Sequence, residues 1–184
     1  MDEKGYTSLK IENIVASGVI ADAIDLADVS QKIANCELNT KRFPGAVLRL
    51  EKPKIASLIF SSGKVVLTGI RDRDSLDVGL KMIIGMLKDA GVNTLETPRV
   101  AVTNIVCSYD MGKYINLNKL VITLNLENIE YEPEQFPGLV YRLKEPKIVA
   151  LLFSSGKIIL TGGKDLSDVK RGLDFLEQKL DSIM

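Results

Sequence analysis

The stretch FPGAVLRLEKPKIASLIFSSGKVVLTG, residues 43–69, occurs twice in this chain and decides which fold to expect. Its second copy is FPGLVYRLKEPKIVALLFSSGKIILTG, residues 136–162, and 18 of the 27 positions are identical at a constant spacing of 93 residues. Upstream, ENIV at residues 12–15 matches TNIV at 103–106, at a spacing of 91 residues. Two copies are too few for a solenoid array, so we expect a pseudo-twofold pair of units, divided as 1–95 and 96–184.

Each copy of the repeat contains three short runs that are rich in β-branched and aliphatic residues. A turn built on proline separates the first two runs, and a Ser-Ser-Gly turn separates the second from the third. Runs joined by such short turns pair as an antiparallel meander. The runs are 46–50, 55–60 and 65–68, then 139–143, 148–153 and 158–161, and a further strand at 8–15 or 99–106 opens each copy.

Helical patterns flank these strands. A short helix is predicted for Asp28–Cys36, and long amphipathic helices are predicted for Arg73–Ala90 and Leu166–Ile183. Gly91 is suited to end the first long helix. Each copy therefore follows the order β-α-β-β-β-β-α. The expected fold class is α+β, with one continuous antiparallel sheet and helices on one of its faces.

Composition narrows the classes of function. The 184 residues include no histidine, so the most common general acid/base and metal ligand is absent and catalysis is disfavoured. The net charge is +0, which argues mildly against nucleic acid, although duplex DNA has the twofold symmetry that a duplicated protein would suit. The two cysteines, Cys36 and Cys107, are not at equivalent repeat positions, so we expect structural thiols in a reducing compartment. No apolar run reaches the roughly 18 residues of a membrane span, and the N-terminus has no signal-peptide pattern.

The face of the sheet that the helices leave open is predicted to be apolar. Strand alternation places a set of duplicated residues on it, and a large exposed apolar face is typical of a binding surface or a buried interface. Four of the five phenylalanines lie at strand ends beside this face, where the residues alone also allow them to be core anchors. The face residues are Val15, Leu58, Val66 and Thr68 with Val106, Leu151, Ile159 and Thr161, and the phenylalanines are Phe43, Phe60, Phe136 and Phe153.

Several of these motifs together resemble a known family. The two cores, the segments IENIVAS and VTNIVCS, and YEPEQFPG before the second core are similar to the two direct repeats of the TATA-box-binding protein family. The resemblance covers the chain from about Lys10 to Leu180. It implies a saddle in which four helices lie on the convex face of a curved sheet. It also implies a general transcription initiation factor that needs no cofactor and is not an enzyme.

The resemblance further implies binding in the minor groove of an A·T-rich promoter element. This family is itself a reference case of minor-groove binding with kinking. The four phenylalanines match its intercalating wedges, Asn13 and Asn104 match paired asparagines that contact bases, and the eight face residues match contacts with the groove. Without the resemblance, an asparagine at a strand end would be read as a turn former. Phosphate contacts are implied for Arg42, Arg49, Lys64 and Ser62, and for Arg142, Lys157 and Ser155.

One loop distinguishes the two copies. Glu132 and Glu134 precede the second FPG motif, whereas the first copy reads LNTKRFPG. In the family, this acidic stirrup docks transcription factor B, and the RNA polymerase machinery follows indirectly. An acidic loop is otherwise a solvated turn. Because the chain is neutral and starts close to its first strand, it resembles an archaeal member, with a cytoplasmic location; a nuclear location applies if it is eukaryotic.

Two other readings stay open at this stage. A duplicated open-sheet module that binds a protein or a hydrophobic ligand is the first alternative, and an enzyme is the second. An exposed apolar face also predicts self-association in the absence of DNA.

Overall fold

The computed structural model describes residues 8–124 and 128–183, which divide into two compact units. The first unit is Asn13–Thr103, and the described part of the second comprises residues 8–12, 104–124 and 128–183. The elements of the first unit are β1 (Lys10–Ala21), α1 (Leu26–Lys32), β2 (Cys36–Leu38), β3 (Ala46–Glu51), β4 (Lys54–Ile59), β5 (Lys64–Ile70) and α2 (Arg73–Asp89).

The second unit repeats this order. A long strand, β6 (Thr94–Asp110), begins in the first unit and leads into the second, as β1 begins in the second and leads into the first. The elements that follow are α3 (Leu117–Thr123), β7 (Ile129–Glu130), β8 (Leu139–Arg142), β9 (Val149–Leu152), β10 (Lys157–Gly163) and α4 (Leu166–Asp181).

The strands form one ten-stranded antiparallel sheet in the order β2-β3-β4-β5-β1-β6-β10-β9-β8-β7. Within each unit the meander expected from the repeat is present, since β3, β4 and β5 pair in sequence, as do β8, β9 and β10. The α+β class with one open antiparallel sheet and four helices is confirmed for the described residues.

Strand register separates two faces in each unit. On β4 and β5, Leu58 lies opposite Val66, and Ser57 lies opposite Leu67. Leu67 and Ser57 have no exposed surface, whereas Leu58 and Val66 are half-buried. Side chains alternate between the faces of a sheet, so one face of the unit is covered and the other is open.

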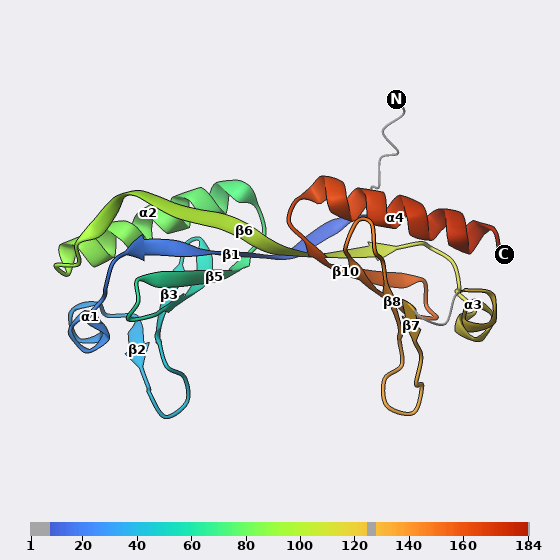
Figure 1. Ribbon diagram of the computed structural model, residues 1–184, viewed down its shortest axis with the longest axis horizontal. Coiled ribbons are helices and arrows are strands. Elements are labelled where there is room, and N and C mark those ends of the chain that lie inside the picture. Colours follow the sequence, from blue (N-terminus) through green and yellow to red (C-terminus); the bar gives the residue numbers. More distant parts are fainter. Residues whose placement is uncertain (1–7, 125–127, 184) are drawn as a thin grey trace. The chain divides into compact units, whose positions relative to one another are not determined.

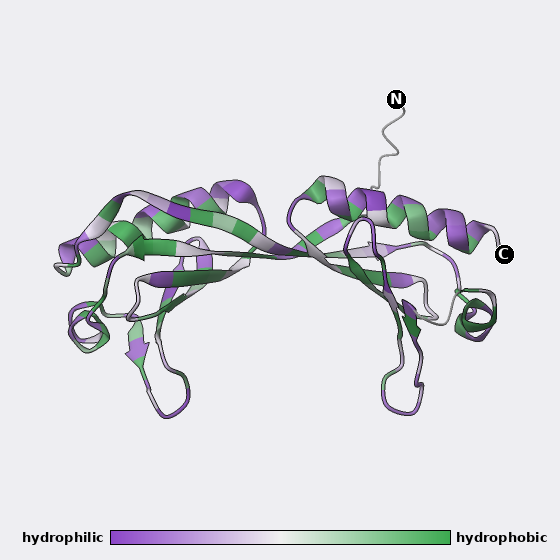
Figure 2. Cartoon of the chain, viewed as in Figure 1, coloured by the Kyte–Doolittle hydropathy of each residue, from purple (hydrophilic) through white to green (hydrophobic). Residues whose placement is uncertain are grey.

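The covered face lies under the long helices. Figure 1 shows α2 along one side of the strands of the first unit and α4 along one side of the strands of the second unit. Ile83 and Leu87 of α2 and Leu173 of α4 are fully buried. Hydrophilic and apolar residues alternate along both helices (Figure 2), as expected for amphipathic helices on a sheet. Asp72 and Asp165 cap their N-termini by accepting backbone N–H bonds.

Some element boundaries differ from the sequence expectation. The first short helix begins at Leu26, and not at Asp28, because the Asp25 side chain accepts the Asp28 N–H and caps the helix. The helix ends at Lys32, so that Cys36 is free to start β2. Both opening strands are longer than predicted, because β1 and β6 are neighbours in the sheet along part of their length. The division at residue 95 stays a prediction.

Both cysteines are free and buried, as expected. Burial raises the pKa of the Cys107 thiol to about 11, and the Glu12 carboxylate contributes to this rise. No helix in the described ranges is long and apolar enough to cross a membrane.

The two faces should differ in their contribution to stability. Leu67→Ala removes a fully buried side chain beneath α2 and should lower the free energy of unfolding by about 2–5 kcal/mol. Leu58→Ala, on the neighbouring strand but on the open face, should cost clearly less. Urea unfolding followed by circular dichroism measures both, and equal losses would contradict the assignment of the faces.

Candidate nucleic-acid interface

The open face of each unit carries a row of apolar side chains across adjacent strands. In the first unit the row runs through Val47, Leu58 and Val66, which face one another on β3, β4 and β5. All three are half-buried, so they form a surface that is apolar but still accessible. The second unit repeats the row with Val140, Leu151 and Ile159.

A β-bulge that is stabilised by a side chain lies at the edge of this row in the first unit. The pairing of β1 with β5 shifts register between Ile14 and Ala16. Beside the shift, the Asn13 Oδ1 atom accepts the Gly69 N–H at 2.8 Å, and its Nδ2 donates to the Thr68 hydroxyl at 3.1 Å. Gly69 has a φ of 86°, which favours glycine. The side chain of Asn13 therefore replaces a backbone partner that the bulge removes.

The second unit contains the same arrangement. Asn104 Oδ1 accepts the Gly162 N–H at 2.6 Å, and its Nδ2 lies 3.1 Å from the Thr161 hydroxyl. Because the glycine N–H can only donate, each amide is oriented with its oxygen inward. The second amide N–H of each asparagine and the Thr68 hydroxyl remain as donors beside the apolar row, whereas the Thr161 hydroxyl donates to Asn104 Oδ1 at 3.4 Å. We refer to each asparagine–threonine pair as a donor pair.

Two phenylalanine pairs lie at the ends of strands next to the open face. The rings of Phe43 and Phe60 meet edge to face with centroids 5.4 Å apart, and those of Phe136 and Phe153 do so at 5.8 Å. Phe136 is 39% exposed and the other three are half-buried. Each pair joins a loop residue to a residue at the start of a hairpin turn. The sequence reading as core anchors is therefore not supported, since none of the four is fully buried.

The glycine in each FPG motif makes room for these rings. A Cβ atom on Gly45 would lie 2.8 Å from the Phe43 ring and 2.6 Å from the Ile59 carbonyl oxygen. A Cβ atom on Gly138 would lie 2.8 Å from Phe136 and 3.0 Å from Phe153. The FPG motif thus positions its own phenylalanine.

The Ser-Ser-Gly hairpin turns present polar groups beside the rings. Phe60 N–H donates to the Lys64 carbonyl at 2.9 Å, and Gly63 N–H donates to the Phe60 carbonyl at 3.0 Å. The corresponding bonds of Phe153 repeat this geometry. The serine and lysine side chains predicted to contact phosphate, Ser62, Lys64, Ser155 and Lys157, are all exposed.

Two of the three arginines predicted to contact phosphate, Arg49 and Arg142, are already paired with carboxylates. Arg49 Nη1 lies 3.3 Å from Glu37 Oε2, and Arg142 Nε lies 3.6 Å from Glu130 Oε1. All four side chains are more than half exposed, so these bonds are weak and readily exchanged. Sequence reasoning missed the glutamates, although their spacing of 93 residues marks them as a duplicated pair. It also missed Val47 and Val140, which strand alternation with Arg49 and Arg142 would have placed on the open face.

The two FPG loops have the same backbone hydrogen bonds but differ in the charge of their side chains. Asn39 O accepts the N–H groups of Arg42 and Phe43, and Glu132 O accepts those of Gln135 and Phe136. The exposed side chains between these bonds are basic in the first loop, with Lys41 and Arg42, and acidic in the second, with Glu132 and Glu134.

Comparisons with known proteins agree with this geometry. A profile of the family described as "Transcription factor TFIID (or TATA-binding protein, TBP)" matches residues 8–90 and 99–183, one copy on each repeat. The chain belongs to the TATA-binding protein family. Among its relatives are the TATA-box-binding protein of Archaeoglobus fulgidus, 49% identical over 94% of both chains, and TATA-box-binding protein 1 of Methanosarcina acetivorans, 47% identical over 96% of this chain and 97% of the relative.

The fold is also that of a solved family member. The structure titled "Methanococcus jannaschii TBP" matches with a TM-score of 0.86 and 44% identity, over 96% of this chain and 99% of that one. The family and fold expected from the repeats are confirmed, as is the archaeal type expected from the neutral charge and the short N-terminus. Members of this family are DNA-binding transcription factors, not enzymes. The roles of individual site residues stay predictions.

The role of the FPG glycine can be tested by a matched pair of variants. Gly45→Ala should destabilise the first unit and displace the Phe43 ring, because the added Cβ lies too close to it. Gly85→Ala in α2 meets nothing within 4 Å and should stabilise the protein by about 0.5–1 kcal/mol, since alanine loses less conformational entropy in a helix. Urea unfolding measures both changes, and aromatic proton shifts report the ring. A Gly45→Ala protein as stable as the wild type would show that the ring moves aside freely.

Proposed function

We propose that this protein is a general transcription initiation factor that binds the minor groove of an A·T-rich TATA element through the open faces of its two units. The proposal rests on one observation: each unit has an asparagine–threonine donor pair within an apolar, accessible surface. Asn13 with Thr68 and Asn104 with Thr161 offer hydrogen-bond donors and few other polar groups.

The chemistry of the donor pairs fits an A·T minor groove. The edges of A·T and T·A pairs show only the adenine N3 and thymine O2 acceptors there, whereas a G·C pair adds the guanine amino donor. The amide oxygens of Asn13 and Asn104 are held by glycine N–H groups, so the groups left over are donors. A surface of donors and aliphatic side chains can bind an A·T pair in either orientation. It offers no acceptor for the amino group of a guanine.

The phenylalanine pairs are suited to open the groove. Each pair presents two partly exposed rings at the end of a strand, and aromatic wedges that enter a base step kink the duplex at a cost of a few kcal/mol per step. The apolar rows offset this cost by contacting the widened groove. Aliphatic contacts read bases weakly, so much of the sequence preference follows from how easily a site deforms.

Cations around the open faces supply phosphate contacts. Lys64 and Lys157 are exposed at the hairpins, and Arg49 and Arg142 exchange a glutamate for a phosphate on binding. A guanidinium bonds phosphate in the same bidentate manner as carboxylate, so this exchange needs little rearrangement. The carboxylates of Glu37 and Glu130 lose their partners in the exchange, which limits non-specific affinity.

The acidic second FPG loop is proposed to dock transcription factor B, through which the polymerase machinery is recruited. Glu132 and Glu134 are exposed, and at the repeat spacing of 93 the first loop has Asn39 and Lys41 in their places. A partner with a basic surface therefore distinguishes the two ends of a nearly symmetric protein.

The function is tested by the preference for A·T pairs. The wild type should bind a duplex with an A·T-rich element more tightly than the same duplex with G·C pairs substituted, by about 1–3 kcal/mol per substituted pair. Thr68→Val with Thr161→Val removes the two hydroxyls beside the asparagine amides while keeping the side-chain shape, so it should weaken binding to the A·T duplex more than to the G·C duplex. Fluorescence anisotropy at one fixed salt concentration measures both. Equal wild-type affinity for the two duplexes would refute the proposal.

The wedges are tested by DNA bending. Phe60→Ala with Phe153→Ala should weaken binding and reduce the bend, because each pair loses the ring at its hairpin while the half-buried positions leave the fold intact. Energy transfer between dyes at the duplex ends measures the bend in the saturated complex. An unchanged bend in a folded variant would exclude these rings as wedges.

The docking loop is tested by charge reversal. Glu132→Arg with Glu134→Arg should leave binary DNA binding near normal, or modestly tighter because positive charge is added, while weakening recruitment of transcription factor B. A mobility-shift titration of the factor onto the preformed complex measures this, and Lys41→Glu in the first loop, at the position that corresponds to Glu134, is the matched control. Equal ternary affinity for the wild type and the acidic-loop variant would rule the loop out as the docking site.

A further inference from the structure

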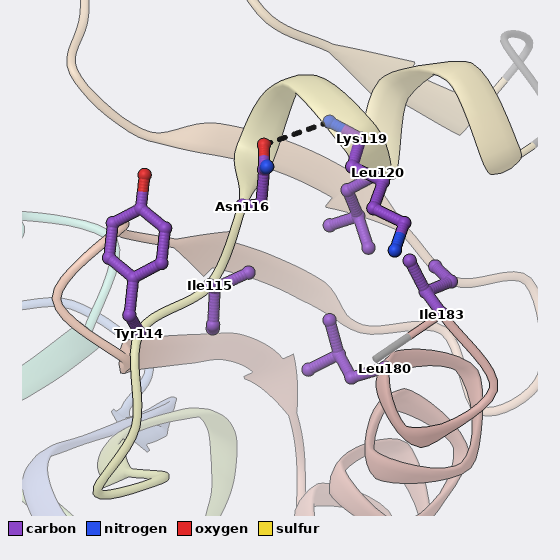
Figure 3. A pocket seen from close by; sticks show the side chains of 7 residues that line it. All are labelled: Tyr114, Ile115, Asn116, Lys119, Leu120, Leu180 and Ile183. Atoms are coloured by element: carbon purple, nitrogen blue, oxygen red, sulfur yellow. Dashed lines mark hydrogen bonds between the residues drawn. The ribbon is translucent and has the colours of Figure 1, made fainter.

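A small cavity lies between α3 and α4 in the second unit. Its volume is about 300 Å³, at the lower end of the range for ligand pockets. Its wall is apolar, made by Ile115, Leu120, Leu180 and Ile183, with Tyr114 and Lys119 also lining it. Figure 3 shows these side chains converging on the space between the helices. None of them belongs to the open face.

The first unit closes the corresponding place with a lysine strap. Lys32, the last residue of α1, donates from Nζ to the Ala90 carbonyl at the end of α2, at 3.2 Å. The same amino group pairs with Asp28 at 2.9 Å. The strap therefore joins the short helix to the end of the long one.

The second unit has lost this strap. With the repeat spacing of 91 residues for the short helix, Thr123 stands where the first unit has Lys32, and its hydroxyl bonds the Lys119 carbonyl within α3 at 2.8 Å. Ile183 corresponds to Ala90 at the spacing of 93. The space that a lysine crosses in one copy is a cavity in the other.

The third residue of the short helix also has opposite charges in the two units. Lys119 corresponds to Asp28, and among the described residues that line the cavity it is the only charged one. In Figure 3 its amino group points toward Ile183 and the apolar wall. The nearby Lys113 is bound to Asp181 at 3.3 Å, so its charge is compensated. An occupant that complements this site combines an apolar group with a carboxylate.

The apolar surface extends beyond the cavity. Tyr114, which lines the cavity, is 69% exposed. An exposed aromatic residue beside an apolar pocket is typical of a docking site for another protein. It enlarges the surface beyond what a small molecule in a cavity of this size would cover.

We propose that the α3–α4 cavity docks a partner protein through an acidic segment that inserts a large apolar side chain. This inference is independent of DNA binding. The charge of the proposed partner is also opposite to that at the second FPG loop, since Glu132 and Glu134 attract a basic surface and Lys119 attracts an acidic one.

The probe is a labelled capped peptide of sequence Asp-Asp-Leu-Phe-Asp-Glu, titrated with the full-length protein by fluorescence anisotropy. Thr123→Lys restores the strap of the first unit and should weaken peptide binding by at least about tenfold. Thr123→Ser keeps the hydroxyl without the strap and should bind as the wild type does. Lys119→Glu should weaken binding similarly, and glutamate suits this first-turn position of the helix, so the fold is kept. All variants should bind DNA normally.

Two control peptides separate the components of the site. Replacing Leu-Phe by Ala-Ala should abolish saturable binding, and replacing the acids by lysines should weaken it. The proposal is overturned if Thr123→Lys and Lys119→Glu both bind the acidic peptide as tightly as the wild type. It is also overturned if the lysine peptide binds equally well, or if concentration-dependent dimerisation of the protein competes with the peptide and is abolished by Thr123→Lys, which would make a second copy the occupant.

Discussion

The antiparallel register of the three-strand meander is the constraint on which the rest of the structure depends. Because Leu58 lies opposite Val66 and Ser57 opposite Leu67, every second side chain of the meander is directed to the helices and the others to the open face. A slip of one residue would exchange the two sets and place the buried leucines in water. The same pairing therefore stabilises the core and creates the accessible apolar rows.

Within this frame the polar part of the site is small and locally buttressed. Asn13 and Asn104 complete the hydrogen bonding of a bulge, so their amide orientation is decided by the fold before any ligand arrives. A group that is already ordered loses little entropy on binding. The arginine–glutamate pairs instead make binding less favourable, since each proposed phosphate contact must first release a carboxylate. The proposed function therefore relies on specific groove contacts more than on bulk charge, which is consistent with a net charge of +0.

The divergence between the copies that bears on partner recognition lies in places that the sheet does not constrain. The FPG loops keep their turn hydrogen bonds but differ in charge, and the short helices keep their caps but differ at Lys32 and Thr123. Surface positions of this kind change at little cost in stability. A duplicated protein can in this way bind a symmetric object with its conserved face and recognise asymmetric partners with its edges.

The sequence alone determined the repeat, the strand meander, the long helices and the apolar character of the open face, because periodicity and turn residues are local properties. The start of α1 at Leu26 is also a local property, since it depends on the Asp25 cap three residues from Asp28, and the sequence reading missed it. The full length of β1 and β6 was decided by tertiary structure, since it depends on pairing between residues far apart in the chain. The same holds for the glutamate partners of Arg49 and Arg142, the edge-to-face ring pairs and the α3–α4 cavity. Each of these depends on distances between elements, which spacing along the chain does not contain.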